Sequence, residues 1–158
     1  MLKYVDTKVT FSEVPDEISL CISLSGCPSR CKGCHSAYLQ EDIGTELTIP
    51  VLDNLIKSNE GITCVCFMGG DNDIPALHEL SKYVKEYYDL KTAWYSGLSF
   101  KPYIDRPSVQ YFDYVKTGPY MELAGPLTSK LTNQRFYKRK EGTIIQFEDI
   151  TYRFWKDD

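Results

Sequence analysis

The stretch Gly26-Cys27-Pro28-Ser29-Arg30-Cys31-Lys32-Gly33-Cys34-His35 carries three cysteines at the spacing C-x3-C-x2-C. It follows residues 18–24, in which large apolar and small residues alternate with the period of two that is typical of a β-strand. The cysteines are therefore expected on a loop that leaves a strand. Three thiolates on one tight loop can bind an iron–sulfur cluster, and such clusters normally take four cysteines. A local set of three would leave one iron without a protein thiolate, the kind of open metal position that a catalytic site needs.

A zinc loop with His35 as the fourth ligand is the alternative interpretation of this stretch. His35 directly follows Cys34, an arrangement that strains tetrahedral coordination, and zinc ligands are usually spaced as two well-separated pairs. The spacing therefore favours an iron–sulfur cluster on Cys27, Cys31 and Cys34.

The size and charge of the chain limit the classes of function to consider. Its 158 residues are about the size of one domain, and we expect residues 1–158 to form a single domain. The apolar and charged fractions, 42% and 25%, are ordinary for a globular protein. The formal net charge of −4 provides no basic field of the kind that binds nucleic acid, so no nucleic-acid partner is expected.

Neither a signal peptide nor a membrane span is indicated by the sequence. The residues after Met1 form no long apolar segment, and no run of about 18 apolar residues occurs. We therefore expect a cytoplasmic protein without a membrane partner. In a reducing compartment, its six cysteines are more typical of metal binding or redox chemistry than of disulfides.

Strand and helix patterns alternate along the chain after the cysteine loop. Thr48 and Asp73 are suitable N-caps for two helices. The elements predicted from periodicity are strands at residues 62–68, 90–95 and 110–115, helices at residues 49–59 and 74–88, and a short helix within residues 98–108. This order is typical of an α/β fold with a mostly parallel sheet.

The C-terminal part of the chain has a weaker pattern. Residues 126–137 are polar and aperiodic, which indicates a loop. Residues 143–147 and 150–155 are rich in β-branched and aromatic side chains, and the turn residues Glu148-Asp149 separate them. This pattern predicts a C-terminal β-hairpin.

Three loops are expected to leave the carboxyl ends of the predicted parallel strands. They are the cysteine loop, Gly69-Gly70-Asp71 and Tyr95-Ser96-Gly97. In open α/β sheets, ligands bind beyond these strand ends. The three loops therefore predict a single cofactor site at one edge of the sheet.

Three further cysteines lie within the predicted strands. Cys21 sits inside residues 18–24, while Cys64 and Cys66 are two residues apart and share one face of their strand. Cys64 and Cys66 could ligate a metal together. Because free cysteine is among the most often buried residues, we favour core positions for all three.

The cysteine spacing resembles the signature of radical S-adenosylmethionine (SAM) enzymes, and Gly69-Gly70-Asp71 is similar to their Gly-Gly-Glu loop. A closer likeness is to the activating proteins of anaerobic (class III) ribonucleotide reductase. The further motifs that resemble this branch are Tyr95-Ser96-Gly97, the stretch from Asp113 to Tyr120, and Asn133-Gln134-Arg135. Lys116 and Thr117 depart from the pattern of the second motif, and Asp71 is one methylene shorter than the usual Glu.

The resemblance implies a partial (β/α) barrel-like fold of the radical SAM type and one [4Fe-4S] cluster on Cys27, Cys31 and Cys34. It also implies that SAM is bound through residues of the remaining motifs: Gly69, Gly70, Asp71, Tyr95, Ser96, Gly97 and Asn133. One electron from the cluster would cleave SAM to methionine and a 5′-deoxyadenosyl radical, which would take a hydrogen atom from a glycine of a partner protein. The chemistry belongs to the cofactors, so no catalytic side chain is expected.

The partners implied by the resemblance are the large subunit of an anaerobic ribonucleotide reductase and an electron donor such as flavodoxin. One alternative is an activator of another glycyl radical enzyme, such as a formate lyase; those chains are usually longer. A second alternative is a non-enzymatic iron–sulfur or zinc module. Such a module would need a fully coordinated metal, and hence a fourth protein ligand.

Overall fold

The computed structural model describes residues 1–27, 37–102, 109–141 and 146–156. The elements in chain order are β1 (Lys3–Thr10), β2 (Ser19–Leu24), the 3-10 helix η1 (Ala37–Gln40), β3 (Thr45–Glu46), α1 (Ile49–Lys57), β4 (Cys64–Met68), α2 (Ile74–Tyr87), β5 (Lys91–Tyr95), β6 (Tyr114–Thr117), β7 (Arg135–Lys140), β8 (Gln146–Asp149) and the 3-10 helix η2 (Thr151–Phe154).

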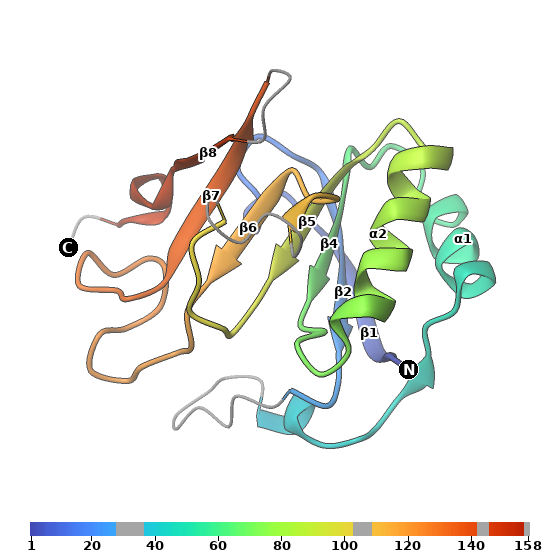
Figure 1. The fold of residues 1–158 in the computed structure, drawn as a ribbon, viewed down its shortest axis with the longest axis horizontal. Coiled ribbons are helices and arrows are strands. Elements are labelled where there is room, and N and C mark those ends of the chain that lie inside the picture. Colours follow the sequence, from blue (N-terminus) through green and yellow to red (C-terminus); the bar gives the residue numbers. More distant parts are fainter. Residues whose placement is uncertain (28–36, 103–108, 142–145, 157–158) are drawn as a thin grey trace.

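The strands form one eight-stranded sheet in the order β3-β1-β2-β4-β5-β6-β7-β8 (Figure 1). The central neighbours β2, β4, β5 and β6 are parallel to one another. The flanking pairs are antiparallel, and β7 and β8 form a C-terminal hairpin. The predicted α/β class is thus confirmed, with the parallel strands at the centre of a mixed sheet.

Both helices lie on the same side of the sheet (Figure 1). The Thr48 hydroxyl accepts a hydrogen bond from the amide of Val51 at 3.3 Å, and the Asp73 carboxylate accepts one from the amide of Ala76 at 3.3 Å. Both N-caps are therefore confirmed. Each helix also has proline in its first turn, where the missing amide hydrogen costs no helical bond. Among the described residues, no helix is long and apolar enough to cross a membrane.

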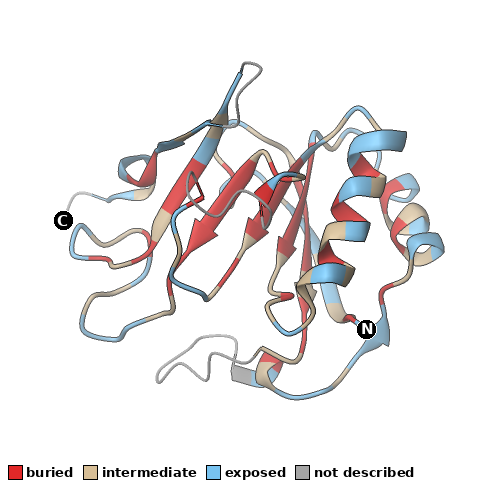
Figure 2. Ribbon diagram, viewed as in Figure 1, coloured by how far each residue is buried: buried red, intermediate tan, exposed pale blue. Residues whose placement is uncertain are grey.

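The side chains of the sheet alternate between two buried clusters, which account for the red strands of Figure 2. The face that packs against α1 and α2, here called the helix face, carries large residues such as Phe67 and Trp94. The opposite face, here called the thiol face, carries Cys21, Cys64 and Cys66. All three cysteines are buried, as expected for core positions.

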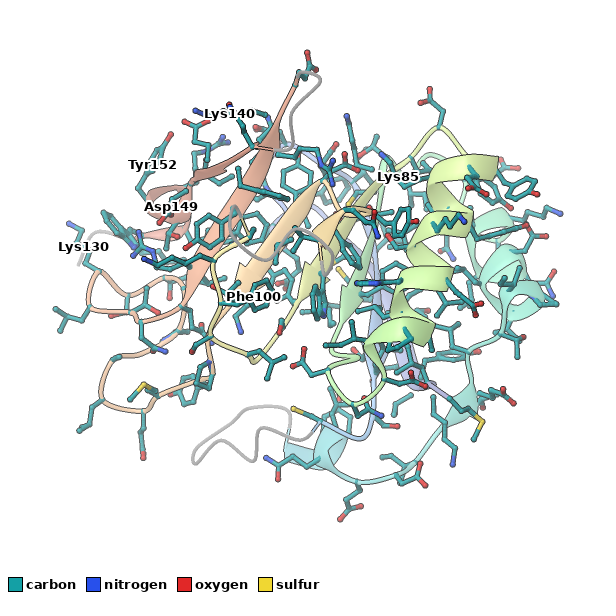
Figure 3. All side chains as sticks on the ribbon, viewed as in Figure 1. Lys85, Phe100, Lys130, Lys140, Asp149 and Tyr152 are labelled. Carbon is teal, nitrogen blue, oxygen red and sulfur yellow. The ribbon has the colours of Figure 1, made fainter. Side chains whose placement is uncertain are left out.

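The structure corrects the predicted fourth strand, because β6 begins at Tyr114 and not at residue 110. Asp113 explains the late start. Its carboxylate accepts hydrogen bonds from the Thr92 amide at 2.9 Å and from the ammonium of Lys85 on α2 at 2.8 Å (Lys85 is labelled in Figure 3). These bonds hold the preceding turn against the helix face.

The C-terminal hairpin also differs from its predicted strands. Residues 135–137, predicted as part of a loop, begin β7, and residues 151–154, predicted as a strand, form η2. Asp149 causes the second change, because its carboxylate accepts hydrogen bonds from the Thr151 amide at 3.0 Å and the Thr151 hydroxyl at 2.6 Å. Such a side-chain turn ends the strand. Residues 143–145 lie outside the described residues.

The short helix predicted within residues 98–108 is not found in its described part. Residues 98–102 form bends and turns, and residues 103–108 lie outside the described residues. Phe100 in this segment (labelled in Figure 3) packs against Trp94, with the ring centroids 5.5 Å apart and the rings tilted by 37°. The described residues 98–102 therefore cover the helix face without helical structure, and the remainder of the predicted helix stays a prediction.

Candidate cofactor site

A cavity of about 200 Å³ lies where the predicted loops leave the parallel strands. Cys27 at the start of the cysteine loop, Gly69 and Asp71 after β4, and Ser96 and Gly97 after β5 line this first cavity. The expected convergence of three loops at one edge of the sheet is therefore present. Cys31, Cys34 and His35 lie outside the described residues.

Cys27 is fixed by backbone contacts. Its amide donates to the carbonyl of Leu39 at 2.9 Å, and the amide of Gly26 donates to the carbonyl of Glu41 at 3.0 Å. The cysteine loop thus begins against η1 and the residues that follow it. Within the described residues, no group of three or more His, Cys, Asp or Glu side chains could hold a metal ion.

Gly69 and Gly70 adopt backbone conformations that favour glycine, with φ of 116° and 94°. A Cβ atom on Gly69 would lie 3.2 Å from the carbonyl oxygen of Leu24, at the end of β2. The Gly69 amide donates to the carbonyl of Tyr95 at 3.0 Å, and its carbonyl accepts from the Trp94 indole at 3.0 Å. The loop after β4 is therefore held closely against both neighbouring strands. Gly70 packs against Leu77 of α2 and does not line the cavity.

Asp71 links the loop after β4 to the loop after β5. One carboxylate oxygen accepts a hydrogen bond from the Ser96 hydroxyl at 2.6 Å, and the other accepts one from the Gly97 amide at 2.8 Å. Asp71, Ser96 and Gly97 were each expected to contact SAM. Their mutual hydrogen bonds show that together they shape the wall of the cavity, and their contacts with SAM stay a prediction.

Tyr95 lies between the first cavity and a larger one on the thiol face. Its hydroxyl donates to the backbone carbonyl of Glu13, and its ring meets Phe136 edge-on at 5.9 Å. Burial raises the pKa of the Tyr95 phenol well above its ordinary value. Tyr95 is therefore a neutral side chain that holds the β1–β2 loop to the end of β5.

Lys116 brings a buried ammonium group to the cavity wall. Its Nζ donates to the carbonyls of Ser96 at 3.0 Å and Gly118 at 2.8 Å, which ties the ends of β5 and β6 together. Sequence reasoning noted Lys116 only as a departure from a motif. Its position at the end of β6, next in the sheet to β5, was the signal that could have placed it at the site.

Asn133 lies behind the cavity wall, and its neighbour Gln134 lines the cavity. The Asn133 amide donates to the carbonyl of Pro119 at 3.0 Å. Its buried side-chain oxygen has no hydrogen-bond partner among the described residues. The Asn-Gln-Arg motif therefore places Gln134 in the cavity wall, and the expected contact of Asn133 with SAM stays a prediction.

The buried thiols of the thiol face differ in their pKa values. Burial raises the pKa of Cys64 and of Cys66 above the ordinary value, which keeps both thiols protonated. The hydrogen bond with Cys66 lowers the pKa of Cys21, which also lies 3.5 Å from the Thr10 hydroxyl. All three are free thiols that pack among Val14, Tyr114 and Phe136.

A second cavity, of about 820 Å³, adjoins the first on the thiol face. The two cavities share five lining residues, which are Met68, Tyr95, Lys116, Tyr120 and Gln134. The second cavity continues from these residues to the β1–β2 loop and η2. The cofactor site therefore opens into a space that is large enough for a further ligand.

In a comparison with known families, residues 18–137 match the family described as a 4Fe-4S single cluster domain. The matched region contains Cys27, Cys31 and Cys34 and the loops that line the first cavity. No curated protein and no solved structure matched the chain.

Proposed function

The chain belongs to the family of 4Fe-4S single cluster domains, and on this premise we propose that it is a radical SAM activating enzyme that generates a glycyl radical on an anaerobic ribonucleotide reductase. The family domain is found in radical SAM activases. The finer assignment rests on the motifs around the site, above all Tyr95-Ser96-Gly97 and Asn133-Gln134-Arg135.

The observation that supports this function best is that Cys27 and the loops after β4 and β5 line the same cavity. The backbone of Gly69 approaches β2 so closely that a side chain would press on Leu24. A cavity of this kind combines a cysteine sulfur with backbone polar groups and a carboxylate. This donor set fits a cluster with an open iron beside the amino and carboxylate groups of SAM.

The residues of this chain would hold and orient both cofactors. Cys27, Cys31 and Cys34 would ligate three irons, and when bound the cluster supplies the electron that cleaves SAM to the radical that acts on the partner's glycine. Asp71 holds the Ser96–Gly97 turn, and Lys116 holds the ends of β5 and β6 in place. The wall of the SAM site is therefore pre-formed, which lowers the ordering cost of binding.

The other cysteines argue against a closed, electron-transfer cluster. A fourth thiolate ligand would have to come from Cys21, Cys64 or Cys66. All three pack in the buried cluster of the thiol face, and none of them lines the first cavity, where Cys27 lies. The open iron that SAM requires is therefore the better interpretation.

The direct test is product formation by anaerobically reconstituted, chemically reduced protein. With SAM we expect methionine and 5′-deoxyadenosine, and with the anaerobic ribonucleotide reductase of the same organism we expect a glycyl radical detected by electron paramagnetic resonance (EPR). Cys31→Ala should lose iron and both activities because two cysteines hold a cluster poorly. Cys64→Ala, a buried core position, is the matched control and should keep its iron. Iron retained in Cys31→Ala, or SAM left uncleaved by the wild type, would contradict the proposal.

A further inference from the structure

Cys21 and Cys66 are direct neighbours on the thiol face. They are register partners on the parallel strands β2 and β4, and both side chains belong to the buried cluster of that face. Neighbouring strands of a sheet are about 4.8 Å apart, and a disulfide joins Cα atoms that are about 4.4–6.8 Å apart. Because both side chains also point to the same face, a disulfide can bridge these two positions without a rearrangement of the backbone.

Cys64 provides the comparison for this pair. It lies on the same strand and the same face as Cys66, and both are free, buried thiols. Its register partner on β2 is Ser19, however, and not a cysteine. Cys64 therefore shares the surroundings of Cys66 but has no thiol opposite it in the sheet.

A cavity of about 390 Å³, here called the Cys21 cavity, is lined by residues of β1 and β2 and contains Cys21 as its only thiol. Its charged residues are Asp6, Lys8 and Glu13. Three hydroxyl side chains and the apolar Leu39 and Met68 complete the wall. Two carboxylates against one ammonium give this wall a negative charge, which favours cationic or neutral molecules over anions.

The surroundings of Cys21 favour its thiolate form. A hydrogen bond with Cys66 lowers the pKa of Cys21, and the Thr10 hydroxyl lies 3.5 Å from the Cys21 sulfur. Burial raises the pKa of Cys66 and of Cys64. The thiolate is the form of cysteine that attacks another sulfur atom. Cys21 is therefore the reactive thiol of the three, and Cys66 is the thiol that lies next to it.

We infer that Cys21 is a modification site for small cationic or neutral disulfides that enter the Cys21 cavity, and that Cys66 converts the product to a disulfide between Cys21 and Cys66. In the first step, the Cys21 sulfur bonds to one sulfur of the reagent. The S–S bond of the reagent breaks, and its other half leaves as a thiol with the Cys21 proton.

In the second step, the Cys66 sulfur bonds to the Cys21 sulfur, and the remaining half of the reagent leaves as a thiol with the Cys66 proton. Two protein thiols are thereby oxidised to one disulfide, and the reagent disulfide is reduced to two thiols. The inference does not depend on the proposed function, because neither Cys21 nor Cys66 lines the first cavity.

Treatment of the anaerobically reconstituted protein with cystamine, a small cationic disulfide, tests this inference. Tandem mass spectrometry should find a disulfide between Cys21 and Cys66 in the wild type, with Cys64 still a free thiol. Cys66→Ala should stop at a mixed disulfide on Cys21, whereas Cys64→Ala, the matched control, should form the same disulfide as the wild type. A free Cys21 in the treated wild type, or a Cys64 that reacts as fast as Cys21, would overturn the inference. Each cysteine is assigned separately, so the result is readable whether or not the protein has bound a cluster.

A rate measurement tests whether the reagent enters through the Cys21 cavity. Each rate at Cys21 is divided by the rate at the same cysteine in the denatured protein, which removes the intrinsic reactivity of the reagent. We expect this ratio to be about tenfold lower for the anionic dithiodiglycolate than for cystamine, because of the negative wall. The double variant Asp6→Asn, Glu13→Gln should bring the two ratios closer together. Equal ratios for the two reagents in the wild type, or a difference that the double variant leaves unchanged, would overturn the assignment of this cavity as the route.

Discussion

On the helix face, β4 presents Val65 and Phe67 to α1 and α2, whereas on the thiol face the same strand presents Cys64, Cys66 and Met68. The neighbouring strand repeats the contrast, with Trp94 on the helix face and Ala93 on the thiol face. Large side chains fill the space beneath the helices. On the other face, the small side chains of β4 and β5 lie beside the rings of Tyr95, Tyr114 and Phe136, and this face borders the second cavity. The helix face therefore holds the larger buried cluster, and the thiol face provides the binding space.

The helix face should be the more sensitive to truncation. Phe67→Ala removes a fully buried ring that meets Phe112 edge-on at 6.5 Å, and we expect it to lower the free energy of unfolding by about 3–5 kcal/mol. Cys66 directly precedes Phe67 and lies on the thiol face. Cys66→Ala removes one sulfur atom and should lower the free energy of unfolding by about 1 kcal/mol. Denaturant unfolding of both variants measures the difference. Equal losses would show that the two faces contribute alike.

A substitution of Gly69, in the loop after β4, tests whether the close approach of this loop to β2 matters for SAM binding. Gly69→Ala should weaken SAM binding about tenfold, about 1.4 kcal/mol, since its Cβ would lie 3.2 Å from the Leu24 carbonyl. Gly61→Ala is the matched control, with φ of 89° and no atom within 4 Å of its Cβ. The control should lose about 1–2 kcal/mol of stability from backbone strain and keep its SAM affinity. Loss of SAM affinity in both variants would point to a general effect of strain.

A substitution of Asp71 tests whether this residue contributes to SAM binding or only to the structure of the cavity wall. Asp71→Ala removes the acceptor for the Ser96 hydroxyl and the Gly97 amide, so we expect about a fivefold loss of SAM affinity, about 1 kcal/mol, with unchanged iron content. Asp89→Ala, an exposed carboxylate before β5, should have no effect on either. SAM affinity that stays at the wild-type value in Asp71→Ala would assign Asp71 a role in the protein structure only.

The smallest expected effect concerns the Asp53 carboxylate on α1. Hydrogen bonds from Lys57 and from Tyr88 and Tyr83 lower the pKa of the Asp53 carboxyl below its ordinary value of 3.8. A lowered pKa stabilises the fold above the ordinary value, and this contribution is lost as the pH falls through the lowered pKa. Asp53→Asn should therefore unfold slightly earlier than the wild type at pH 7, and the two should converge as the pH falls below the lowered pKa of Asp53. Thermal unfolding across this pH range provides the measurement, and a constant difference at all pH values would refute the assignment.

Local signals in the sequence were sufficient for much of the fold. The caps Thr48 and Asp73 and the two-residue alternation of the central strands depend on neighbours in sequence, and the structure has them as predicted. The end of the hairpin was predicted wrongly because Asp149 forms a side-chain turn with Thr151 in a segment that is otherwise rich in strand formers. β propensity alone does not reveal such competition from a side chain.

For the candidate site, too, local features were predicted from the sequence and long-range contacts were not. The convergence of the three loops followed from the order of the parallel strands, and Gly69, Asp71, Ser96 and Gly97 do line one cavity. Lys116 was not predicted as a site residue, and Gln134 was named only as part of the Asn-Gln-Arg motif, because their positions depend on how β6 and β7 pair, which joins segments distant in sequence. The link between Asp71 and the Ser96–Gly97 turn is a tertiary contact of the same kind. Sequence spacing alone does not show contacts of this kind.

The most direct test of the central claim is the EPR spectrum of the anaerobically reconstituted, reduced protein with and without SAM. We predict the signal of a reduced [4Fe-4S] cluster that changes when SAM is added, because SAM would bind the iron that lacks a protein thiolate. A cluster signal that is indifferent to SAM, or bound zinc without iron, would contradict it and would support a closed metal site.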